Sequence, residues 1–531
     1  MAVENLITEH IDIWTSAAKT KSASGRGSSK KLELYGVKKL RELILELAVR
    51  GKLVPQDPND EPAEVLIEKS LEVKASLIEK KLLKKSRSKK NINKEHFFTY
   101  PDSWASAKIE DLIHVVNGRA YKKAEMLSSG TPILRVGNLF TSNEWYYSNL
   151  ELEDNKYISS GDLIYAWSAS FGPFIWDGGK VIYHYHIWKM DIFNEAVLNK
   201  HFSKIFLQTI SERIKASGNG IAMIHMTKER MEKVVHPLPP IEEQHRIVAK
   251  VDELMALCDQ LEQQTEVSIE AHQVLVTTLL DTLTNSADAD ELMQNWARIS
   301  EHFDTLFTTE ESIEQLKQAI LQLAVMGKLV SFGNSRKTML KELLSFGPRN
   351  GLSPKEAPSR TELKVLKLGA TSYGSLDLEQ SKYIDVDVKD KPYLFLTRGD
   401  ILIQRGNSAN FVGSNVLIQE DHHNYIYPDL MMKLRVNQLI SPEFLSLFLS
   451  ANTSREHMWK QMTGTSGTMP KISKKVVEGL PVTFPTNKNI QVEVVSQTNK
   501  LIALCDKLRT RLTGCSETKT TLCDVMTQQA Y

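Results

Sequence analysis

The sequence predicts an α+β protein in which two mixed α/β domains stand in a pseudo-twofold arrangement, separated by long antiparallel coiled-coil helices. The chain repeats itself: residues 47–54 read LAVRGKLV and residues 323–330 read LAVMGKLV, while ALCD occurs at 256–259 and again at 503–506. Apolar residues recur at steps of four and three along two segments that are long enough for coiled coils. Two stretches with short β-type runs, aromatic residues and turn residues lie between the helical segments. Such repetition predicts a duplicated unit that binds two similar but non-identical targets.

Length and composition describe an ordinary globular protein of several domains. A chain of 531 residues predicts roughly three to four domains of about 150 residues. Apolar residues make up 41% of the chain, and no apolar run approaches the roughly 20 residues of a membrane span. The start lacks a basic leader with an apolar stretch, and the four cysteines form no CxxC pair. We therefore expect a cytoplasmic protein without a membrane segment, a disulfide framework or a zinc site.

The net charge gives no support for a nucleic-acid partner by itself. It is +1, whereas a free-standing DNA-binding domain usually has a clear basic excess, because phosphate contacts dominate affinity. Contact with nucleic acid must therefore rest on local patches or on positive surface supplied by partner subunits.

The patterns divide the chain into five regions. We predict an N-terminal helical region with a basic linker at 1–96, a first mixed domain at 97–240, a central helical spacer region at 241–339, a second mixed domain at 340–485 and a C-terminal helical spacer at 486–531. In the first region, segment 22–29 is typical of a flexible linker. The basic run 80–90 is interpreted as a solvated helix end that grades into a linker, with contact to DNA or a partner as the alternative.

Two helical landmarks recur in both halves. Apolar stripes predict helices that end at Gly51 and at Gly327, each glycine acting as a C-cap. The longer helices begin near Ile247 and Val494, and each carries an unbroken heptad pattern over more than thirty residues, about 50 Å of helix. We interpret them as spacers. The predicted apolar seam includes Leu254, Cys258, Leu261, Leu275, Leu501, Cys505, Leu508 and Leu522.

The two mixed stretches share a frame but differ at its tips. Gly161-Asp162-Leu163-Ile164 is similar to Gly399-Asp400-Ile401-Leu402, and each predicts a strand that follows Gly-Asp. The continuations differ entirely: residues 165–170 read YAWSAS, and residues 403–408 read IQRGNS. A shared frame with divergent tips is typical of recognition domains.

At this point the sequence resembles the specificity subunit of type I restriction-modification systems. The resemblance rests on LPPIEEQ at 238–244 and the helix that follows it, on the two AVxGKLV segments and on the two Gly-Asp strands, and it spans the whole chain. The second half departs from the family pattern, because the junction at 484–491 lacks the double proline and the acidic pair. The second AVxGKLV also continues as SFG at 331–333 where the first continues as PQD. These departures bear on how equivalent the two partner-docking faces are.

The resemblance implies a function for each part of the chain. Two target-recognition domains each read one part of a split sequence in double-stranded DNA, and the paired long helices fix the gap. The chain itself binds no cofactor and catalyses nothing. Methyl transfer belongs to modification subunits, expected in two copies, and ATP-driven translocation and cleavage to restriction subunits. S-adenosylmethionine, ATP and Mg are therefore expected on the partner subunits.

Motifs for catalysis are absent from the sequence, in agreement with that implication. It contains neither a GxxxxGK[ST] phosphate loop nor an Asn- or Asp-Pro-Pro-aromatic tetrapeptide. Asp429 follows a proline as in some nucleases, but no Glu-x-Lys lies nearby, which favours a structural role. The histidine pairs at 184/186 and 422/423 lack a carboxylate or cysteine at a recurring spacing, which favours surface or base-contacting roles over metal ligation.

Basic and amide residues at loop tips are the candidates for DNA contact. Arginine and asparagine can bond guanine and adenine edges with two hydrogen bonds, whereas lysine mainly positions the protein on phosphates. For each residue the alternative is a solvated surface charge. Segment 465–468 (TSGT) precedes part of this set. The candidates are Arg119, Tyr121, Lys122, Lys123, Lys228, Arg230, Arg405, Asn407, Ser408, Asn410, Lys471 and Lys474.

Two other classes of function stay open at the level of the sequence. A coiled-coil scaffold whose globular domains bind proteins would explain the neutral charge but not the divergent polar tips. An enzyme with an unrecognised site is the third hypothesis. Substitution of Arg405 and Asn407 distinguishes the first two: base recognition predicts an altered preference at one half-site, and the scaffold predicts unchanged DNA affinity.

Overall fold

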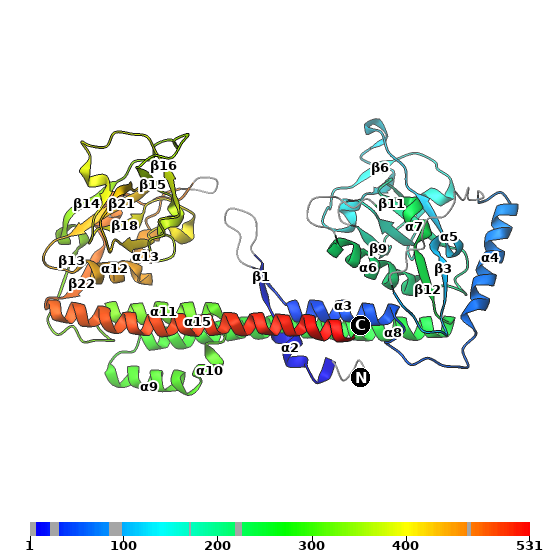
Figure 1. Ribbon diagram of the computed structural model, residues 1–531, viewed down its shortest axis with the longest axis horizontal. Coiled ribbons are helices and arrows are strands. Elements are labelled where there is room, and N and C mark those ends of the chain that lie inside the picture. Colours follow the sequence, from blue (N-terminus) through cyan, green and yellow to red (C-terminus); the bar gives the residue numbers. More distant parts are fainter. Residues whose placement is uncertain are drawn as a thin grey trace. The chain divides into compact units, whose positions relative to one another are not determined.

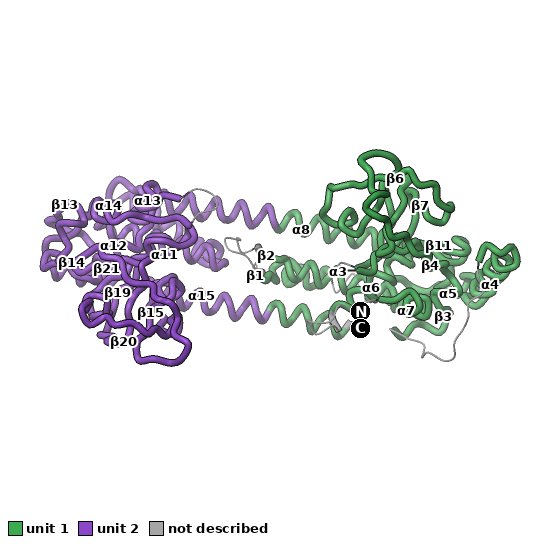
Figure 2. Tube along the Cα trace, turned by 90° about the horizontal axis from the view of Figure 1, so that it is seen from above, with its two compact units in different colours: residues 1–19, 33–265, 519–531 green, residues 20–32, 266–518 purple. Residues whose placement is uncertain are grey.

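The computed structural model describes residues 7–21, 31–83, 98–168, 171–217, 226–464 and 469–530. The predicted linker 22–29, most of the basic run (84–90) and segment 465–468 lie outside the described residues. The chain forms two compact units, which Figure 2 colours separately: Met1–Lys19, Glu33–Thr265 and Lys519–Tyr531 in unit 1, Thr20–Leu32 and Glu266–Thr518 in unit 2. Sheets, short helices and two very long helices make this an α+β protein, as predicted (Figure 1). The five region boundaries stay predictions.

The first half of the chain ends with the first long helix, α8. In chain order they are α2 (Ile11–Ser16), β1 (Lys19–Lys21), β2 (Lys31–Glu33), α3 (Tyr35–Val49), α4 (Ala63–Glu79), β3 (Ala105–Lys108), α5 (Ile109–Leu112), β4 (Ile113–Asn117), η1 (Lys123–Glu125), β5 (Thr131–Leu134), η2 (Val136–Leu139), β6 (Tyr146–Ser148), η3 (Asp154–Lys156), β7 (Tyr157–Ile158), β8 (Leu163–Ala166), β9 (Gly172–Ile175), β10 (Val181–Tyr183), β11 (Ile187–Ile192), α6 (Lys200–Ser217), α7 (Lys228–Lys233), β12 (Val235–Leu238) and α8 (Ile241–Thr284).

The second half ends with the other long helix. Its elements are α9 (Ala289–Glu301), α10 (Phe303–Leu306), α11 (Glu310–Val325), β13 (Ser335–Met339), η4 (Leu340–Leu343), β14 (Leu344–Asn350), β15 (Lys364–Leu366), η5 (Leu368–Thr371), β16 (Ser381–Tyr383), η6 (Pro392–Leu394), β17 (Phe395–Leu396), β18 (Ile401–Gln404), η7 (Ala409–Phe411), β19 (Asn415–Leu417), β20 (His422–Ile426), β21 (Met431–Val436), α12 (Pro442–Ser450), α13 (Asn452–Trp459), α14 (Lys474–Glu478), β22 (Pro481–Pro485) and α15 (Lys488–Ala530).

The sheets of the two halves have the same strand order. The first half forms β6-β5-β10-β7, β4-β11-β8-β9 and the pair β12-β3, and the second forms β16-β15-β20-β17, β14-β21-β18-β19 and β13-β22. In each, one pair is parallel, β5 with β10 and β15 with β20. The predicted duplication is therefore present in the topology of the two sheet regions, although few letters are shared between them.

The two AVxGKLV segments end their helices in the same way. Gly51 and Gly327 have φ angles of +67° and +73°, which favour glycine over residues with a Cβ atom. The next residue, Lys52 or Lys328, donates its backbone N–H to the carbonyl of Leu47 (3.0 Å) or Leu323 (2.9 Å). This is the Schellman arrangement that the sequence predicts for a glycine C-cap.

The buried stripe of each long helix departs from the predicted heptads. Leu254 and Cys258 are buried, as is Cys505, while Leu261, Leu501 and Leu508 are half-buried. Leu275 and Leu522 are 51% and 40% exposed, and their neighbours Val276 and Cys523 are buried instead. The prediction of these two leucines in the seam is therefore wrong. A strict seven-residue repeat drifts by about 20° per heptad against a straight helix of 3.6 residues per turn, so the buried face moves to the next residue.

Matching ion pairs join the shorter helices to the long ones. Arg41 on α3 binds Asp259 on α8 at 2.5 Å, and Lys317 on α11 binds Asp506 on α15 at 2.6 Å. Both carboxylates are the Asp of the repeated ALCD segment. Each contact lies within one unit, so the repeated letters mark the same helix packing in both.

A buried glutamine fixes the start of the first long helix. Gln244 is fully buried. Its side-chain oxygen accepts a hydrogen bond from Asn199 N at 2.8 Å, and its amide donates to the carbonyls of Val197 (3.0 Å) and Pro239 (2.9 Å). The helix is thereby connected to the chain that enters α6 and to the end of β12.

Gln491 makes three corresponding contacts at the start of α15, the last of them to a carbonyl one residue further back along the chain. It accepts from Ser441 N at 2.7 Å and donates to the carbonyls of Leu439 (3.1 Å) and Pro485 (2.9 Å). The second junction lacks the double proline and the acidic pair of LPPIEEQ but has kept this glutamine. No helix in the described parts of the chain is both long and apolar enough to cross a membrane.

Candidate nucleic-acid interface

The Gly-Asp motifs form a rigid turn that begins an equivalent strand in each half. Gly161 and Gly399 both have φ of +88°. Asp162 accepts a hydrogen bond from Ser159 N at 2.8 Å, and Asp400 accepts one from Thr397 N at 3.0 Å. The motif therefore supports β8 and β18 rather than contacting a ligand itself.

A lysine from the neighbouring strand completes this turn. Lys189 on β11 binds Asp162 at 2.9 Å, and Lys433 on β21 binds Asp400 at 2.9 Å. Lys433 and Asp400 are 1% and 0% exposed, and burial lowers the pKa of Lys433 even beside its partner. Buried pairs of this kind tolerate little change, because removal of one member leaves an uncompensated charge.

The residue that follows the Gly-Asp strand occupies the same place in both halves. Trp167 N–H donates to the carbonyl of His186 at 3.1 Å, and Arg405 N–H donates to the carbonyl of Leu430 at 2.8 Å. His186 and Leu430 lie in the equivalent turns before β11 and β21. We call this place the post-strand position. Its side chain is an indole in one half and a guanidinium in the other.

Aromatic rings surround the post-strand position of the first half. Trp167 stacks on Trp188 with ring centroids 5.9 Å apart, and Trp188 stacks on Tyr165 at 5.8 Å. His186 meets the Trp167 ring edge-on at 5.0 Å. Tyr185, at the tip of the turn, is 40% exposed. Sequence reasoning did not select Trp167 or Tyr185, although the position of Tyr185 between His184 and His186 was a signal for the second.

The predicted basic tip of the first half is partly engaged within the protein. Arg119 forms an ion pair with Glu125 at 2.7 Å, and its guanidinium lies over the ring of Tyr121. Tyr121 is 8% exposed, so its ring supports the arginine from inside. Lys122 and Lys123 are exposed. These four residues stay predicted DNA contacts, of which the two lysines are exposed, Arg119 is half-buried and Tyr121 is buried.

The turn at His184 brings this basic tip beside the aromatic cluster. Arg119 pairs with His184 in an isolated parallel bridge, and Tyr185 N–H donates to the carbonyl of Arg119 at 3.0 Å. Burial, with His186 and Arg135 nearby, lowers the pKa of His184 to about 4, so its ring is neutral at pH 7. The first tip thus combines cationic, neutral polar and aromatic side chains.

The second tip gathers most of its predicted residues. Arg405 Nε donates to the carbonyl of Ile472 at 3.4 Å, and Gly406 pairs with Lys471 in an antiparallel bridge. Asn407 Nδ2 donates to Gln404 Oε1 at 2.7 Å, and its Oδ1 accepts from Ser408 N at 2.7 Å. The loop after β18 and the chain before α14 therefore lie together, as the sequence could not show.

The remaining candidates lie near helix ends. Lys228 and Lys474 are the first residues of α7 and α14, which are capped by the equivalent residues Thr227 and Ser473. Arg230 lies on α7 and is exposed. Asn410 is exposed in η7, and its backbone carbonyl accepts a hydrogen bond from Arg455. None of the twelve residues is tested as a DNA contact, and all stay predictions.

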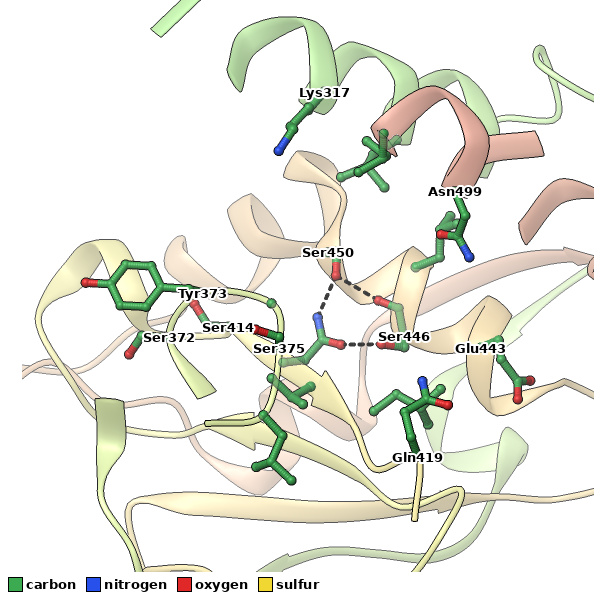
Figure 3. Close-up of a pocket in the computed structure, with 18 of the residues that line it drawn as sticks. Lys317, Ser372, Tyr373, Ser375, Ser414, Gln419, Glu443, Ser446, Ser450 and Asn499 are labelled. Carbon is green, nitrogen blue, oxygen red and sulfur yellow. Dashed lines mark hydrogen bonds between the residues drawn. The ribbon is translucent and has the colours of Figure 1, made fainter. Parts of the chain in front are cut away.

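Unit 2 also contains a cleft of about 1240 Å³ between its sheet region and the helices α11, α12 and α15. Figure 3 shows Ser446 and Ser450 there, hydrogen-bonded through the side chain of Asn415. Lys317 and Arg509 on its wall both pair with Asp506. The lining carries three basic side chains, of Lys317, Arg455 and Arg509, and four acidic ones, of Glu314, Glu420, Glu443 and Asp506. The cleft therefore offers no positive field that would select phosphate. Among the described residues, no group of histidine, cysteine and carboxylate side chains is arranged to hold a metal ion.

Taken together, the fold defines a duplicated binding protein: two equivalent sheet regions, held by equivalent glutamines, present different chemistry at one equivalent position. Comparison with known proteins gives the class a name. Residues 101–271 match the family model described as "Type I restriction modification DNA specificity domain". The chain is 32% identical to the EcoEI and 31% identical to the EcoAI type I restriction enzyme specificity subunits of Escherichia coli, over 100% of each chain.

One more distant relative and two solved structures are similar to the chain to a lower degree. The EcoKI specificity subunit of Escherichia coli K12 is 23% identical over 77% of this chain and 84% of its own. One solved chain belongs to a structure that concerns the complex assembly and conformational transition of a type I restriction-modification system. It has a TM-score of 0.48 and 16% identity, and the match covers 81% of this chain and 98% of that chain. The HsdS subunit from Thermoanaerobacter tengcongensis has a TM-score of 0.39 and 16% identity, covering 83% and 99%. The protein belongs to the family of type I restriction enzyme specificity subunits, which confirms the resemblance seen in its sequence.

Proposed function

We propose that this chain is the DNA-recognition subunit of a type I restriction-modification complex, and that its two sheet regions each read one part of a split target in double-stranded DNA. Membership of the specificity-subunit family supports the general function. The single observation that supports the split is the post-strand position, where Trp167 and Arg405 stand in equivalent frames. A duplicated scaffold with unlike side chains at one position suits two unlike half-sites.

The partners follow from the same proposal. The chain positions modification subunits, two in number, and restriction subunits on the target. S-adenosylmethionine is assigned to the modification subunits, and ATP and Mg to the restriction subunits. The complex acts in the cytoplasm. Exposed lysines at both tips would position the chain on the DNA phosphates. Because the net charge of this chain is +1, the greater part of the positive surface would come from the partner subunits.

The test is a map of methylated adenines in cells that express the chain with the modification subunit encoded beside it. Single-molecule sequencing should find one split motif with a fixed gap. A second chain, in which residues 340–485 come from a relative of different specificity, should change only one half of the motif. An assembled complex that methylates no motif would refute the proposal and return weight to the protein-binding scaffold.

A further inference from the structure

We infer that the post-strand position determines which base pair each half accepts: Arg405 reads a guanine, and Trp167 with Tyr185 accepts the methyl group of a thymine. This inference rests on the proposed function and adds the residues and the bases. It follows from the hydrogen-bond donors and the apolar surface of each side chain that its contacts within the protein do not use.

Arg405 is anchored at three points and keeps its outer nitrogens available. Its backbone N–H and carbonyl are bonded to Leu430 and Ile472 at 2.8 and 2.9 Å, and Nε donates to the Ile472 carbonyl. In the described part of the chain, no carboxylate lies within ion-pair distance of it and no acceptor bonds Nη1 or Nη2. By contrast Arg119 is paired with Glu125. A guanidinium held at Nε presents two parallel N–H groups, which match O6 and N7 of guanine.

Asn407 is better suited to hold the loop than to read a base. Both ends of its amide are already used, by Gln404 and by the backbone of Ser408. Gln404 itself is fully buried, and its amide donates to the carbonyl of Leu368 and the hydroxyls of Thr371 and Ser372 at 2.9–3.0 Å. This buried network fixes the loop directly after Arg405. We therefore assign base discrimination to Arg405 and loop position to Asn407.

Trp167 can discriminate only through apolar contact. Its single side-chain donor, Nε1, is used in a hydrogen bond to the carbonyl of Tyr185 at 2.8 Å. One of its faces stacks on Trp188, so the ring cannot rotate away. Tyr185 extends the apolar surface into solvent. In the major groove, the C5-methyl group of thymine is the only apolar feature that distinguishes one base pair from another.

The first experiment uses the wild-type complex of the chain with its modification subunits, and DNA carrying the motif from the methylation map. Each guanine of the second half-site is replaced in turn by 7-deazaguanine, which lacks N7, and each thymine of the first half-site by deoxyuridine, which lacks the methyl. One replacement in each half should weaken binding by about tenfold, and the others by less than about twofold. Uniform tolerance of all replacements in either half would overturn the inference for that half.

The second experiment changes the protein, with a control from the same strand. In the assembled complex, Arg405→Gln should change the accepted base at the position found with 7-deazaguanine and nowhere else. Trp167→Gln should relax the thymine position, and Trp167→Phe should retain it. Arg398 is an exposed arginine in the Gly-Asp turn at the other end of β18 from Arg405, and Arg398→Gln should leave the motif unchanged. An unaltered motif in Arg405→Gln would refute the inference while the split wild-type motif still supports the proposed function; a wild-type complex without any motif would refute the function itself.

Discussion

At the scale of single residues, the acidic pair of LPPIEEQ contains a carboxylate in an unfavourable place. Glu243 is 1% exposed, and neither of its oxygens nor the nearby Trp104 Nε1 has a hydrogen-bond partner of good geometry. Burial raises its pKa above the ordinary 4.5. In the second half Ile490 stands just before Gln491, as Glu243 stands before Gln244, and it packs on the apolar core.

Glu243→Gln should therefore stabilise unit 1 at neutral pH, by about 1–3 kcal/mol. The raised pKa means that the folded chain holds this proton after the unfolded chain has lost it, so its contribution to stability falls as the pH rises above 4.5. The variant should lose that slope. Urea unfolding at pH 5 and pH 8 measures both effects, with Glu242→Gln on the exposed side of the same turn as control. Equal losses of stability with pH in variant and wild type would contradict the account.

The same scale shows where sequence reasoning ended. Arg405 and Lys471 were predicted as contacts from residue type and loop position, and the structure brings their segments together through a bridge between Gly406 and Lys471 that no local pattern encodes. Tyr121 was selected for the same reasons but is buried, because its ring packs beneath Arg119. Trp167 was not selected, since the candidates were chosen from basic and amide residues at loop tips. Whether a side chain at a tip faces solvent depends on distant contacts.

At the scale of elements, the two halves differ in the side-chain contacts between a helix of the sheet region (α6 or α13) and the shorter helix packed against it (α3 or α11). Glu46 on α3 is buried and binds Arg213 on α6 through both oxygens, at 2.5 and 2.6 Å. In the second half the acidic residue near Arg455 on α13 is Glu314 on α11, which forms no ion pair with it among the described residues. Gln322 stands at the sequence position that corresponds to Glu46. The Nε of Arg455 and the Oε1 of Gln322 are buried without partners, and burial lowers the pKa of Arg455.

Removing the acidic residue near each arginine should affect the two units unequally. Glu46→Gln should destabilise unit 1 by about 3 kcal/mol, because it leaves a partly buried guanidinium without its counter-charge. Glu314→Gln should cost unit 2 less than about 1 kcal/mol, because no ion pair joins Glu314 to Arg455 among the described residues. Hydrogen exchange resolved by segment separates the units. An equal loss of protection in the two variants would show that Arg455 depends on Glu314 as Arg213 depends on Glu46.

The glutamines at the long-helix junctions give a second prediction at this scale. Gln244→Ala and Gln491→Ala each remove three hydrogen bonds to buried backbone groups, so each should cost about 3 kcal/mol of stability. Gln419, which is exposed on the surface of unit 2, provides the control Gln419→Ala, with no more than about 0.5 kcal/mol expected. Denaturant unfolding followed by tryptophan fluorescence measures all three. If a junction variant loses no more stability than the control, that glutamine does not fix the start of its long helix.

The long helices show what periodicity alone can and cannot predict. Their existence followed from the sequence, although they begin at Ile241 and Lys488, six residues before the predicted starts. The predicted seven-residue repeat does not hold along the whole length of each helix. One step of four residues replaces an expected step of three, so Val276 and Cys523 are buried while Leu275 and Leu522 are exposed. Over a few turns the two periods are indistinguishable, and over ten turns they are not.

At the scale of the whole molecule, the equal strand orders and junctions predict that the sheet regions are interchangeable. A chain in which residues 335–485 are replaced by residues 105–238 keeps a glutamine junction at both long helices, since Gln244 and Gln491 both lie outside the exchanged segments. With its modification subunits it should methylate a motif whose two halves are inverted copies of one half-site. Methylation mapping detects this directly. A motif that still contains the second wild-type half-site would refute the assignment of recognition to these segments.

The paired glutamines have a consequence for how such proteins change over time. Since each sheet region is attached through the same three backbone contacts, a region from another chain with that glutamine needs no new fit to the helix that receives it. Acquiring one new region then yields a new specificity with every region that can occupy the other place. The number of possible target sequences is the product of the numbers of sheet regions available for the two places. A small set of exchangeable sheet regions therefore gives many different targets.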